Sequence, residues 1–483
     1  NIRLLHGSVS KYFLDQSDSD SILISYYSDD YDDWRFSFVK REYLREFSDT
    51  GRLKVKEQIS PVRRYSYLVG KNEPNHTAQS QLAPLLFEEK FRNPSINQLV
   101  EAFSVEKVSD LFFEKYKSLT FELRDSLEEL KKNDKNINKE FSNKDIKTLD
   151  FAKKLMGQII FIYFIQKKGW IGIKKSENGD YPIWGEGPKD FFKRLYKKEY
   201  CDYENFYNDV LEYLFYEDLS SEKAESISRR LNCKIPFLNG GLFEPLNNHN
   251  WKETNIAIKN DIFERIIETF NQFNFTIQEE DPLDVDIAID PEMLGRVLEN
   301  LLDENIKKSQ GVFYTHRKVV NFMCDYSLKK FLQNKVSKLF SDSEINSLIA
   351  NQEGFEKTEF KKNKLKELAS VIDSELEEIK ICDPAVGSGA FPVILMKKIT
   401  NIRVLLSKIM NKEISEYDLK YNFIKNSLHA VDINASAIEV TKLRLWLSLI
   451  IDIEDFKKVK PLPNLQYRVI QGDSLIEKLD NIE

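Results

Sequence analysis

The sequence predicts an α/β protein: a partial, doubly wound parallel sheet over residues 286–483, a mainly helical domain over 76–285, and a small β-containing segment over 1–75. Three observations predict this division. Near the end, three short apolar patterns each lead into an acid, and helical patterns follow the first two. Through the middle, apolar residues recur at helical spacing. At the start, strand-like runs flank a turn.

Composition and charge bound the class of protein. The 483 residues are 41% hydrophobic and 31% charged, which is typical of a globular protein with a core. By length, about three domains are expected. The net charge of -7 does not indicate a nucleic-acid binder, although it says little about a local basic cleft.

Cysteine usage and hydropathy predict a cytoplasmic protein. Four cysteines without paired spacing predict free thiols in a reducing compartment: Cys201, Cys233, Cys324 and Cys382. The most apolar run, Leu155–Ile165, is shorter than the ~18 residues of a membrane span, so no membrane segment is expected. Because the chain begins at Asn1 and stops at Glu483 soon after a strand pattern, we expect it to be part of a longer protein.

The first segment predicts a hairpin. Ser21–Tyr27 and Trp34–Val39 are strand-like and flank the acid-rich turn 29–33. Acids beside strands are also found in nuclease metal sites, but aspartate is common in turns for local reasons. The turn interpretation is favoured, and no nuclease and no metal site is assigned.

The middle of the chain predicts long helices. One pattern consists of Leu99, Phe103, Val108, Leu111, Phe112, Tyr116 and Leu119, and a second helix is predicted over Ile146–Trp170. A helix is also predicted to start at Asp290. Lysine runs are interpreted as solvated helix faces. The best candidates for phosphate contact are Lys167, Lys168, Lys174 and Lys175.

The strongest local signal is the string Asp383-Pro384-Ala385-Val386-Gly387-Ser388-Gly389-Ala390-Phe391. It follows a strand pattern and precedes a helix that Pro392 is predicted to open. The Gly-Lys-Ser/Thr ending of a phosphate-binding loop is absent, and so is the third glycine of a dinucleotide fingerprint. The turn offers an acceptor, Asp383, so its ligand should carry donors or positive charge. S-adenosylmethionine fits this chemistry.

Two further acids follow strand patterns. Asp432 ends the pattern 427–431, and Asp473 follows the pattern 467–470. Ser436 and Glu439 predict a capping box for the next helix. The three acids could bind the methionine ammonium, the ribose hydroxyls and the adenine amino group, in that order. Singly, Asp432 could instead be a helix cap and Asp473 a turn residue.

These motifs resemble those of adenine-specific DNA methyltransferases. The string 383–391 is similar to their cofactor motif, Phe313-Tyr314-Thr315 to the motif before it, and Asp432-Ile433 and Gly472-Asp473-Ser474-Leu475 to the next two. The turn 239–244 and the segment 290–295 resemble the middle of large fused (type IIG-like) restriction-modification enzymes. The resemblance implies a Rossmann-like S-adenosylmethionine-dependent domain with these cofactor-binding residues: Phe313, Tyr314, Thr315, Asp383, Pro384, Ala385, Gly387, Gly389, Phe391, Asp432, Ile433, Asp473 and Leu475.

The sequence departs from the family in two places. Thr315-His316 replaces the usual Thr-Pro, which puts the local helix start in question. The Asn-Pro-Pro-Tyr motif that normally follows the third strand is not reached before Glu483, so no catalytic residue is assigned. In the family this motif holds the flipped adenine and its amino group. The cytosine-carbon class is disfavoured because the chain has no Pro-Cys dipeptide.

The resulting prediction is the cofactor half of an adenine-specific methyltransferase that acts on double-stranded DNA in a restriction-modification or phage-defence system. Endonuclease and target-recognition domains would lie elsewhere on the full-length chain. Two alternatives remain. The same motifs would serve methylation of an RNA or protein nitrogen, and the domain could instead be a cofactor-sensing scaffold for an endonuclease. Residues beyond Glu483 would discriminate between these hypotheses.

Overall fold

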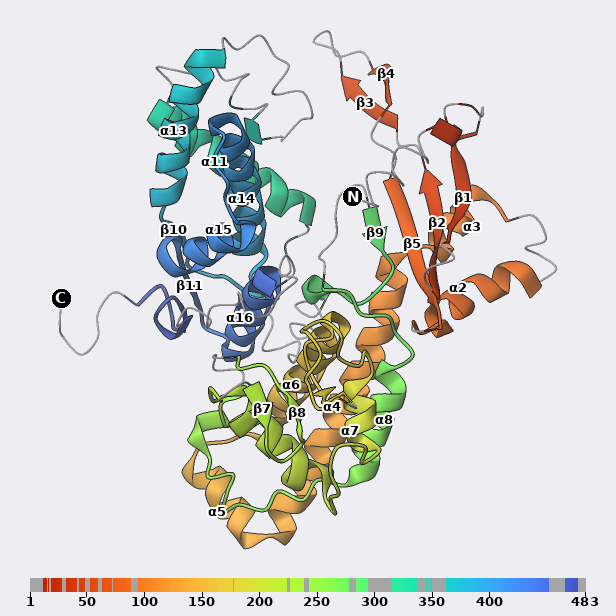
Figure 1. The fold of residues 1–483 in the computed structure, drawn as a ribbon, viewed down its shortest axis with the longest axis vertical. Helices are drawn as coiled ribbons and strands as arrows, with labels where there is room; N and C mark the ends of the chain where they lie inside the picture. Colours follow the sequence, from red (N-terminus) through yellow and green to blue (C-terminus); the bar gives the residue numbers. More distant parts are fainter. Residues whose placement is uncertain are drawn as a thin grey trace. The chain divides into compact units, whose positions relative to one another are not determined.

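The structure is a computed structural model that divides into two compact units, residues 1–122 with 259–293, and residues 123–258 with 294–483. It describes residues 12–14, 16, 19–27, 32–40, 43–47, 53–59, 63–71, 73–87, 94–176, 178–223, 226–238, 243–277, 284–293, 315, 317–336, 345, 348–349, 362–450 and 465–476. Both units combine helices with a sheet (Figure 1).

The first unit contains a four-stranded sheet in the order β1-β2-β5-β9. β1 (Ser21–Tyr26) and β2 (Asp33–Lys40) are antiparallel, which confirms the predicted hairpin. β5 (Arg63–Gly70) continues the antiparallel order, and β9 (Asp284–Asp286) pairs with it in parallel. The turn residues 29–31 lie outside the described part of the chain. A separate hairpin joins β3 (Tyr43–Phe47) to β4 (Leu53–Ile59).

Aromatic side chains form the core of the first unit. Phe103 contacts the rings of Phe36, Phe38 and Tyr67 on the sheet, at centroid distances of 5.1–5.7 Å. The helices here are α2 (His76–Phe87), α3 (Ile96–Ala102), the first part of α4 (Val105–Asn133) and α8 (Asn260–Phe270). The apolar pattern predicted from Leu99 to Leu119 is therefore divided between α3 and α4. The break falls where the Ser104 hydroxyl accepts the Lys107 amide at 3.3 Å.

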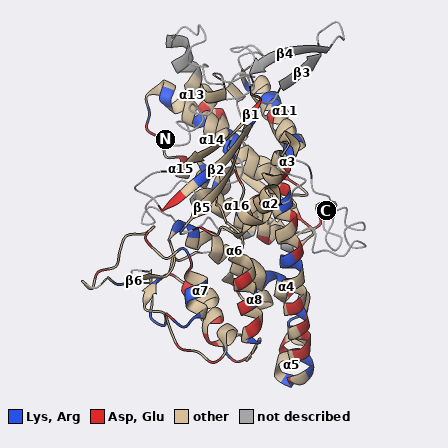
Figure 2. Ribbon diagram, turned by 90° about the vertical axis from the view of Figure 1, so that its right-hand side faces the viewer, with Lys and Arg blue, Asp and Glu red and all other residues tan. Residues whose placement is uncertain are grey.

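The helical part of the second unit is built around α6 (Thr148–Lys168), the buried helix that the sequence predicted. Around it lie α5 (Lys135–Asn143), α7 (Phe191–Tyr196), the π-helical turns η2 (Tyr207–Leu211) and η3 (Leu214–Leu219), and the 3-10 turn η6 (Leu246–Asn248). A small sheet has the order β6-β8-β7, from Ile173–Lys174, Cys233–Lys234 and Ile227–Ser228. Figure 2 shows basic and acidic segments intermixed along α4 and α5, as expected of solvated helix faces.

A buried carboxyl group lies between the two π-helical turns. Glu212 is 1% exposed, and burial raises its pKa to about 9. Tyr207 is a hydrogen-bond partner of Glu212, and the Tyr207 and Tyr216 hydroxyls are 3.3 Å apart. Glu212 is therefore protonated at neutral pH.

The rest of the second unit contains a parallel sheet in the order β10-β11-β12, with strands Ile381–Asp383, Leu428–Asp432 and Val469–Gln471. The three predicted strands and their parallel arrangement are confirmed. The helices are α11 (Arg317–Val336), α13 (Lys362–Glu378), α14 (Ala390–Met410), α15 (Glu416–Asn422) and α16 (Ala435–Ile450), with short turns η8 (Phe423–Ser427) and η10 (Leu465–Tyr467). No helix in the described ranges is both long and apolar enough to cross a membrane.

Two predicted helix starts differ from the structure. α14 begins at Ala390, so Pro392 is its third residue, where its missing N–H costs nothing. The capping box of Ser436 and Glu439 is wrong. α16 begins at Ala435, and the Asn434 side chain caps it by accepting the Ala437 amide at 3.2 Å. Asn434 can do so because it precedes the first helical residue, whereas Ser436 already lies inside the helix. A helix was also predicted to start at Asp290. There the Asp290 carboxylate accepts the Met293 amide at 2.8 Å.

Candidate cofactor-binding site

Hydrogen bonds join the three loops that follow the parallel strands. The Val386 amide donates to the Val431 carbonyl at 2.9 Å, and the Gly387 amide donates to Asp432 Oδ2 at 2.8 Å. The Gly472 amide donates to the Asp432 carbonyl at 2.9 Å. Because the strands are parallel, their carboxyl ends lie at one edge, where open α/β sheets bind ligands. The structure therefore brings the three sequence-predicted segments together.

The glycine turn needs its glycines for two separate reasons. Gly387 and Gly389 have φ angles of 54° and 84°, which L side chains rarely adopt. A Cβ atom on Gly389 would also lie 3.0 Å from Thr441 Oγ1 and 3.1 Å from its Cγ2. The turn therefore lies so close to α16 that a side chain on Gly389 would force Thr441 to shift.

Asp383 presents a carboxylate that is incompletely bonded. Its Oδ1 accepts the Ala385 amide at 3.2 Å, while its buried Oδ2 has no hydrogen-bond partner among the described residues. Burial raises the pKa of Asp383 and the charge of Asp432 adds to this, whereas the Ala385 amide opposes it. A cationic donor on a ligand would satisfy Oδ2 and relieve the penalty on the charged form. This orphaned oxygen fits the ammonium group of S-adenosylmethionine.

Asp432 links the glycine turn to the start of α16. Its Oδ2 accepts the Gly387 amide, and its Oδ1 accepts the Asn434 amide, both at 2.8 Å. The cap of α16 is Asn434, so the helix-cap alternative for Asp432 is wrong. Each carboxylate oxygen has two acceptor sites, so one remains open on each. Replacing Asp432 would therefore remove the acceptors of two backbone amides, whatever its role toward a ligand.

Asp473 lies in an exposed turn. Its Oδ1 accepts the Leu475 amide at 2.9 Å, which is the turn geometry that the sequence left open as an alternative. Two apolar side chains near it are exposed, Ile433 at 47% and Leu475 at 87%. The Gln471 side chain donates to the Ile433 carbonyl at 3.1 Å and ties the second loop to the third strand. Exposed apolar groups beside an acceptor suit a flat ring that carries an amino group.

The remaining predicted site residues differ in their surroundings. Phe391 packs against a cluster of Val320, Cys324 and Ile394 between α11 and α14, so its ring has a structural role. Pro384 and Ala385 are exposed on the turn. Thr315 is partly buried just before α11, and Phe313 and Tyr314 lie outside the described residues.

Two side chains that were not among the sequence-predicted site residues contact the turn. The Thr441 hydroxyl donates to the Gly387 carbonyl at 2.8 Å, and Arg444 Nη1 donates to the Ser388 carbonyl at 2.9 Å. Both residues are buried. A signal was present: they are polar residues three apart in a mostly apolar helix, which places them on one face.

The four lysines proposed for phosphate contact, called here the lysine rim, lie at the end of α6 (Lys167 and Lys168) and at β6 (Lys174 and Lys175). Three of them lie over aromatic rings, at 5.4 Å for Lys168 over Trp170, 4.2 Å for Lys174 over Tyr200 and 5.5 Å for Lys175 over Tyr181. Such cation–π contacts hold the side chains in place while leaving their charge at the surface.

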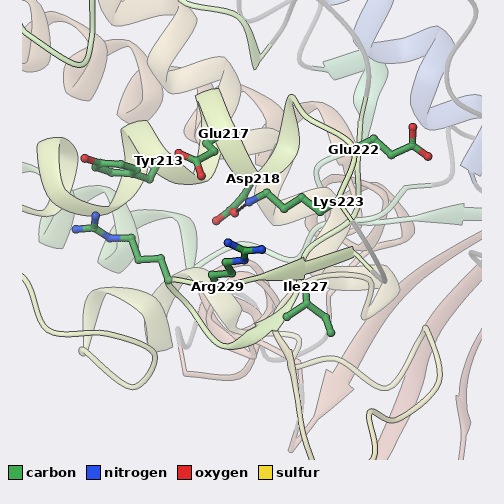
Figure 3. Close-up of a pocket in the computed structure, with 8 residues that line it drawn as sticks. Tyr213, Glu217, Asp218, Glu222, Lys223, Ile227 and Arg229 are labelled. Carbon is green, nitrogen blue, oxygen red and sulfur yellow. Dashed lines mark hydrogen bonds and ion pairs between the residues drawn. The ribbon is translucent and has the colours of Figure 1, made fainter.

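A pocket of about 510 Å³ lies in the helical part of the second unit (Figure 3). The buried Asp218 pairs there with Lys223 and accepts the Ser228 hydroxyl at 2.8 Å. Its lining carries equal numbers of acids and bases: Tyr213, Glu217, Asp218, Glu222, Lys223, Ile227, Arg229 and Arg230. This balance selects neither an anionic nor a cationic ligand, and no predicted site residue lines the pocket.

Comparisons with known proteins find similarity to DNA methyltransferases. Residues 355–461 match the model of the MmeI DNA-methyltransferase domain. A Methanocaldococcus jannaschii protein described as a type II restriction enzyme and methyltransferase is 28% identical over 408 residues, which cover 78% of this chain and 32% of the relative. DNA methyltransferase A of Bacillus subtilis (strain 168) is 24% identical over 160 residues, which cover 33% of this chain and 16% of the relative.

A solved structure of the type IIL restriction-modification enzyme MmeI in complex with DNA is also similar. Its TM-score is 0.44 at 15% identity, covering 75% of this chain and 40% of that chain. This chain therefore spans less than half the length of each of these three proteins. Residues 355–461 are therefore similar to the DNA-methyltransferase domain of MmeI, and most of the chain is similar to a protein described as a type II restriction enzyme and methyltransferase.

Proposed function

We propose that this chain supplies the cofactor-binding part of a methyltransferase that transfers a methyl group from S-adenosylmethionine to the exocyclic amino group of adenine in double-stranded DNA. The observation that carries the proposal is the orphaned Oδ2 of Asp383 at the end of β10, beside a glycine turn that hydrogen bonds hold in place. The similarity to a DNA-methyltransferase domain gives the reaction class.

Each strand-end acid has a task in this proposal. Asp383 binds the ammonium of the cofactor through Oδ2. Asp432 accepts from the ribose hydroxyls with the acceptor sites that its two backbone partners leave open. Asp473 accepts from the adenine amino group, and Ile433 and Leu475 cover the faces of the ring. The cofactor supplies an electrophilic methyl group on its sulfonium.

The choice of adenine rests on the order and identity of the motifs. An exocyclic amine is a weak nucleophile because its lone pair is delocalised into the ring, so it must be held out of the stack and hydrogen-bonded as it reacts. The Asn-Pro-Pro-Tyr string associated with that task does not occur in the 483 residues. The proposal therefore assigns cofactor binding to this chain, and assigns none of its residues to base capture, target recognition or DNA cleavage.

Two measurements test the proposal. Calorimetric titration of the 483-residue chain with S-adenosylmethionine should show one site, and absence of binding would refute the cofactor assignment. Radiolabelled methyl transfer to unmethylated DNA should require a longer chain that adds the Asn-Pro-Pro-Tyr string, with N6-methyladenine as the product. Transfer by the 483 residues alone would show that the catalytic residues are misplaced. Label that appears in RNA or protein, but not in DNA, would instead favour a methyltransferase that acts on an RNA or protein nitrogen.

A further inference from the structure

Two buried polar side chains of α16 take up the carbonyl groups of the glycine turn. Thr441 is fully buried and Arg444 is 1% exposed. Burying a guanidinium is costly unless it is hydrogen-bonded, so an arginine here needs a specific partner. Arg444 Nη1 donates to the Ser388 carbonyl at 2.9 Å, and the Thr441 hydroxyl donates to the Gly387 carbonyl at 2.8 Å. Consecutive carbonyls of the turn therefore both point toward α16.

The direction of these carbonyls fixes the direction of an amide. In a planar trans peptide the N–H points opposite to the C=O. Because Thr441 holds the Gly387 carbonyl, the N–H of Ser388 must point away from α16. Ser388 is 3% exposed, and its amide makes no hydrogen bond to any described residue. A buried donor without a partner is rare in folded proteins, so this amide is suited to an anionic or carbonyl group of a ligand.

The opposite side of α16 is held by the helical part of the same unit. The Trp446 ring lies 4.7 Å from the Phe161 ring on α6. At 3.6 residues per turn, Trp446 projects roughly 140° from Thr441 and roughly 160° from Arg444 around the helix. The side chains that contact the turn are thus on a different face from those that anchor the helix. Changes on the two faces can therefore be separated by experiment.

We propose that Thr441 and Arg444 are positioning residues that hold the turn 387–389 so that the Ser388 amide receives the carboxylate of the cofactor's amino-acid end. The inference rests on the proposed cofactor. Asp383, which ends β10 just before the turn, then receives the ammonium, so the two charges of the amino acid are bound by groups of opposite polarity. Neither positioning residue touches the ligand.

The test compares ligands with and without the amino-acid end. Thr441→Val removes the hydroxyl donor at nearly constant volume, and Thr441→Ser retains it. Affinities for S-adenosylhomocysteine and for 5′-methylthioadenosine, which lacks the amino acid, are measured by calorimetry. Thr441→Val should weaken the binding of S-adenosylhomocysteine roughly tenfold, about 1.4 kcal/mol. It should weaken the binding of 5′-methylthioadenosine by less than about twofold. Thr441→Ser should restore the affinity.

Two further variants separate positioning from general packing. Trp446→Phe, on the other face of α16, should lower the melting temperature and leave both affinities unchanged. Arg444→Lys keeps the charge but loses the guanidinium geometry, and should repeat the ligand-selective loss if Thr441→Val does not fold. Equal losses for both ligands, or none in either variant, would overturn the positioning roles while leaving the proposed function intact. A wild-type chain that binds neither ligand would overturn both.

Discussion

Replacing Asp383 with asparagine should separate ligand binding from folding. The substitution keeps Oδ1, which accepts the Ala385 amide at 3.2 Å, and replaces the orphaned Oδ2 with an uncharged donor. Hydrogen bonds to charged groups contribute ~1.5–3 kcal/mol, so the affinity for S-adenosylmethionine should fall roughly 10- to 150-fold. The added donor would also face the cationic ammonium, which places the expected loss toward the upper end.

The stability of the free protein should not fall together with the affinity. Burial raises the pKa of Asp383, which means that the folded state disfavours its charge. A neutral amide avoids this penalty, so Asp383→Asn should leave the free chain as stable as the wild type or make it more stable. A loss of affinity with no loss of stability is typical of a group kept for binding.

The pH dependence has a defined sign. With its pKa raised in the folded state, Asp383 holds a proton at pH values where the unfolded chain has lost it. Its contribution to stability is therefore most favourable at low pH and falls as the pH rises from 3.8 through the folded pKa. Cofactor binding needs the ionised form, so wild-type affinity should fall as the pH is lowered through that pKa. The asparagine variant should not show this dependence.

The assay is calorimetric titration at several pH values, with chemical denaturation of the free proteins alongside. Glu416→Gln, an exposed acid at the start of α15, is the matched control for loss of one negative charge. It should change neither affinity nor its pH dependence. Wild-type affinity in Asp383→Asn, or a large loss of stability, would refute the assignment of Oδ2 to the ammonium.

Three further predictions follow from other groups. Asp432→Asn should lower cofactor affinity less than Asp432→Ala, because asparagine keeps one of the two acceptor oxygens that join the turn to the start of α16. Calorimetry should show the smaller loss of affinity for asparagine, and melting curves the smaller loss of stability. Glu212 has its pKa raised to about 9 by burial, so stability should fall as the pH rises from 4.5 toward 9, by at most ~1.4 kcal/mol per pH unit. Glu212→Gln should remove that slope in denaturation experiments, and an unchanged slope would contradict the burial argument. If the lysine rim contacts DNA phosphates, changing Lys174 and Lys175 to glutamine should reduce the slope of log affinity against log salt by roughly 2, measured by fluorescence anisotropy with unrelated duplexes. Equal slopes in the wild type and the variant would exclude Lys174 and Lys175 from contact with DNA phosphates.

Much of the site could be predicted because its signals are local. A strand, a glycine turn and a helix follow one another within 379–410, and periodicity together with glycine and proline placement is sufficient to recognise them. Parallel strands end at the same edge, so the convergence of the segments around Asp383, Asp432 and Asp473 follows from their order alone. The buried helix α6 and the hairpin of β1 and β2 were predicted for the same reason.

The tertiary structure decided which partner each polar group takes. Asp432 binds two backbone amides from different segments, Asn434 caps α16 in place of Ser436, and β9 pairs with β5 across more than 200 intervening residues. Sequence patterns show which faces are buried, but a hydrogen bond depends on atoms brought together from distant positions. For that reason Thr441 and Arg444 appeared in the sequence only as polar exceptions in an apolar helix, and their contacts with the glycine turn emerged when the chain was folded.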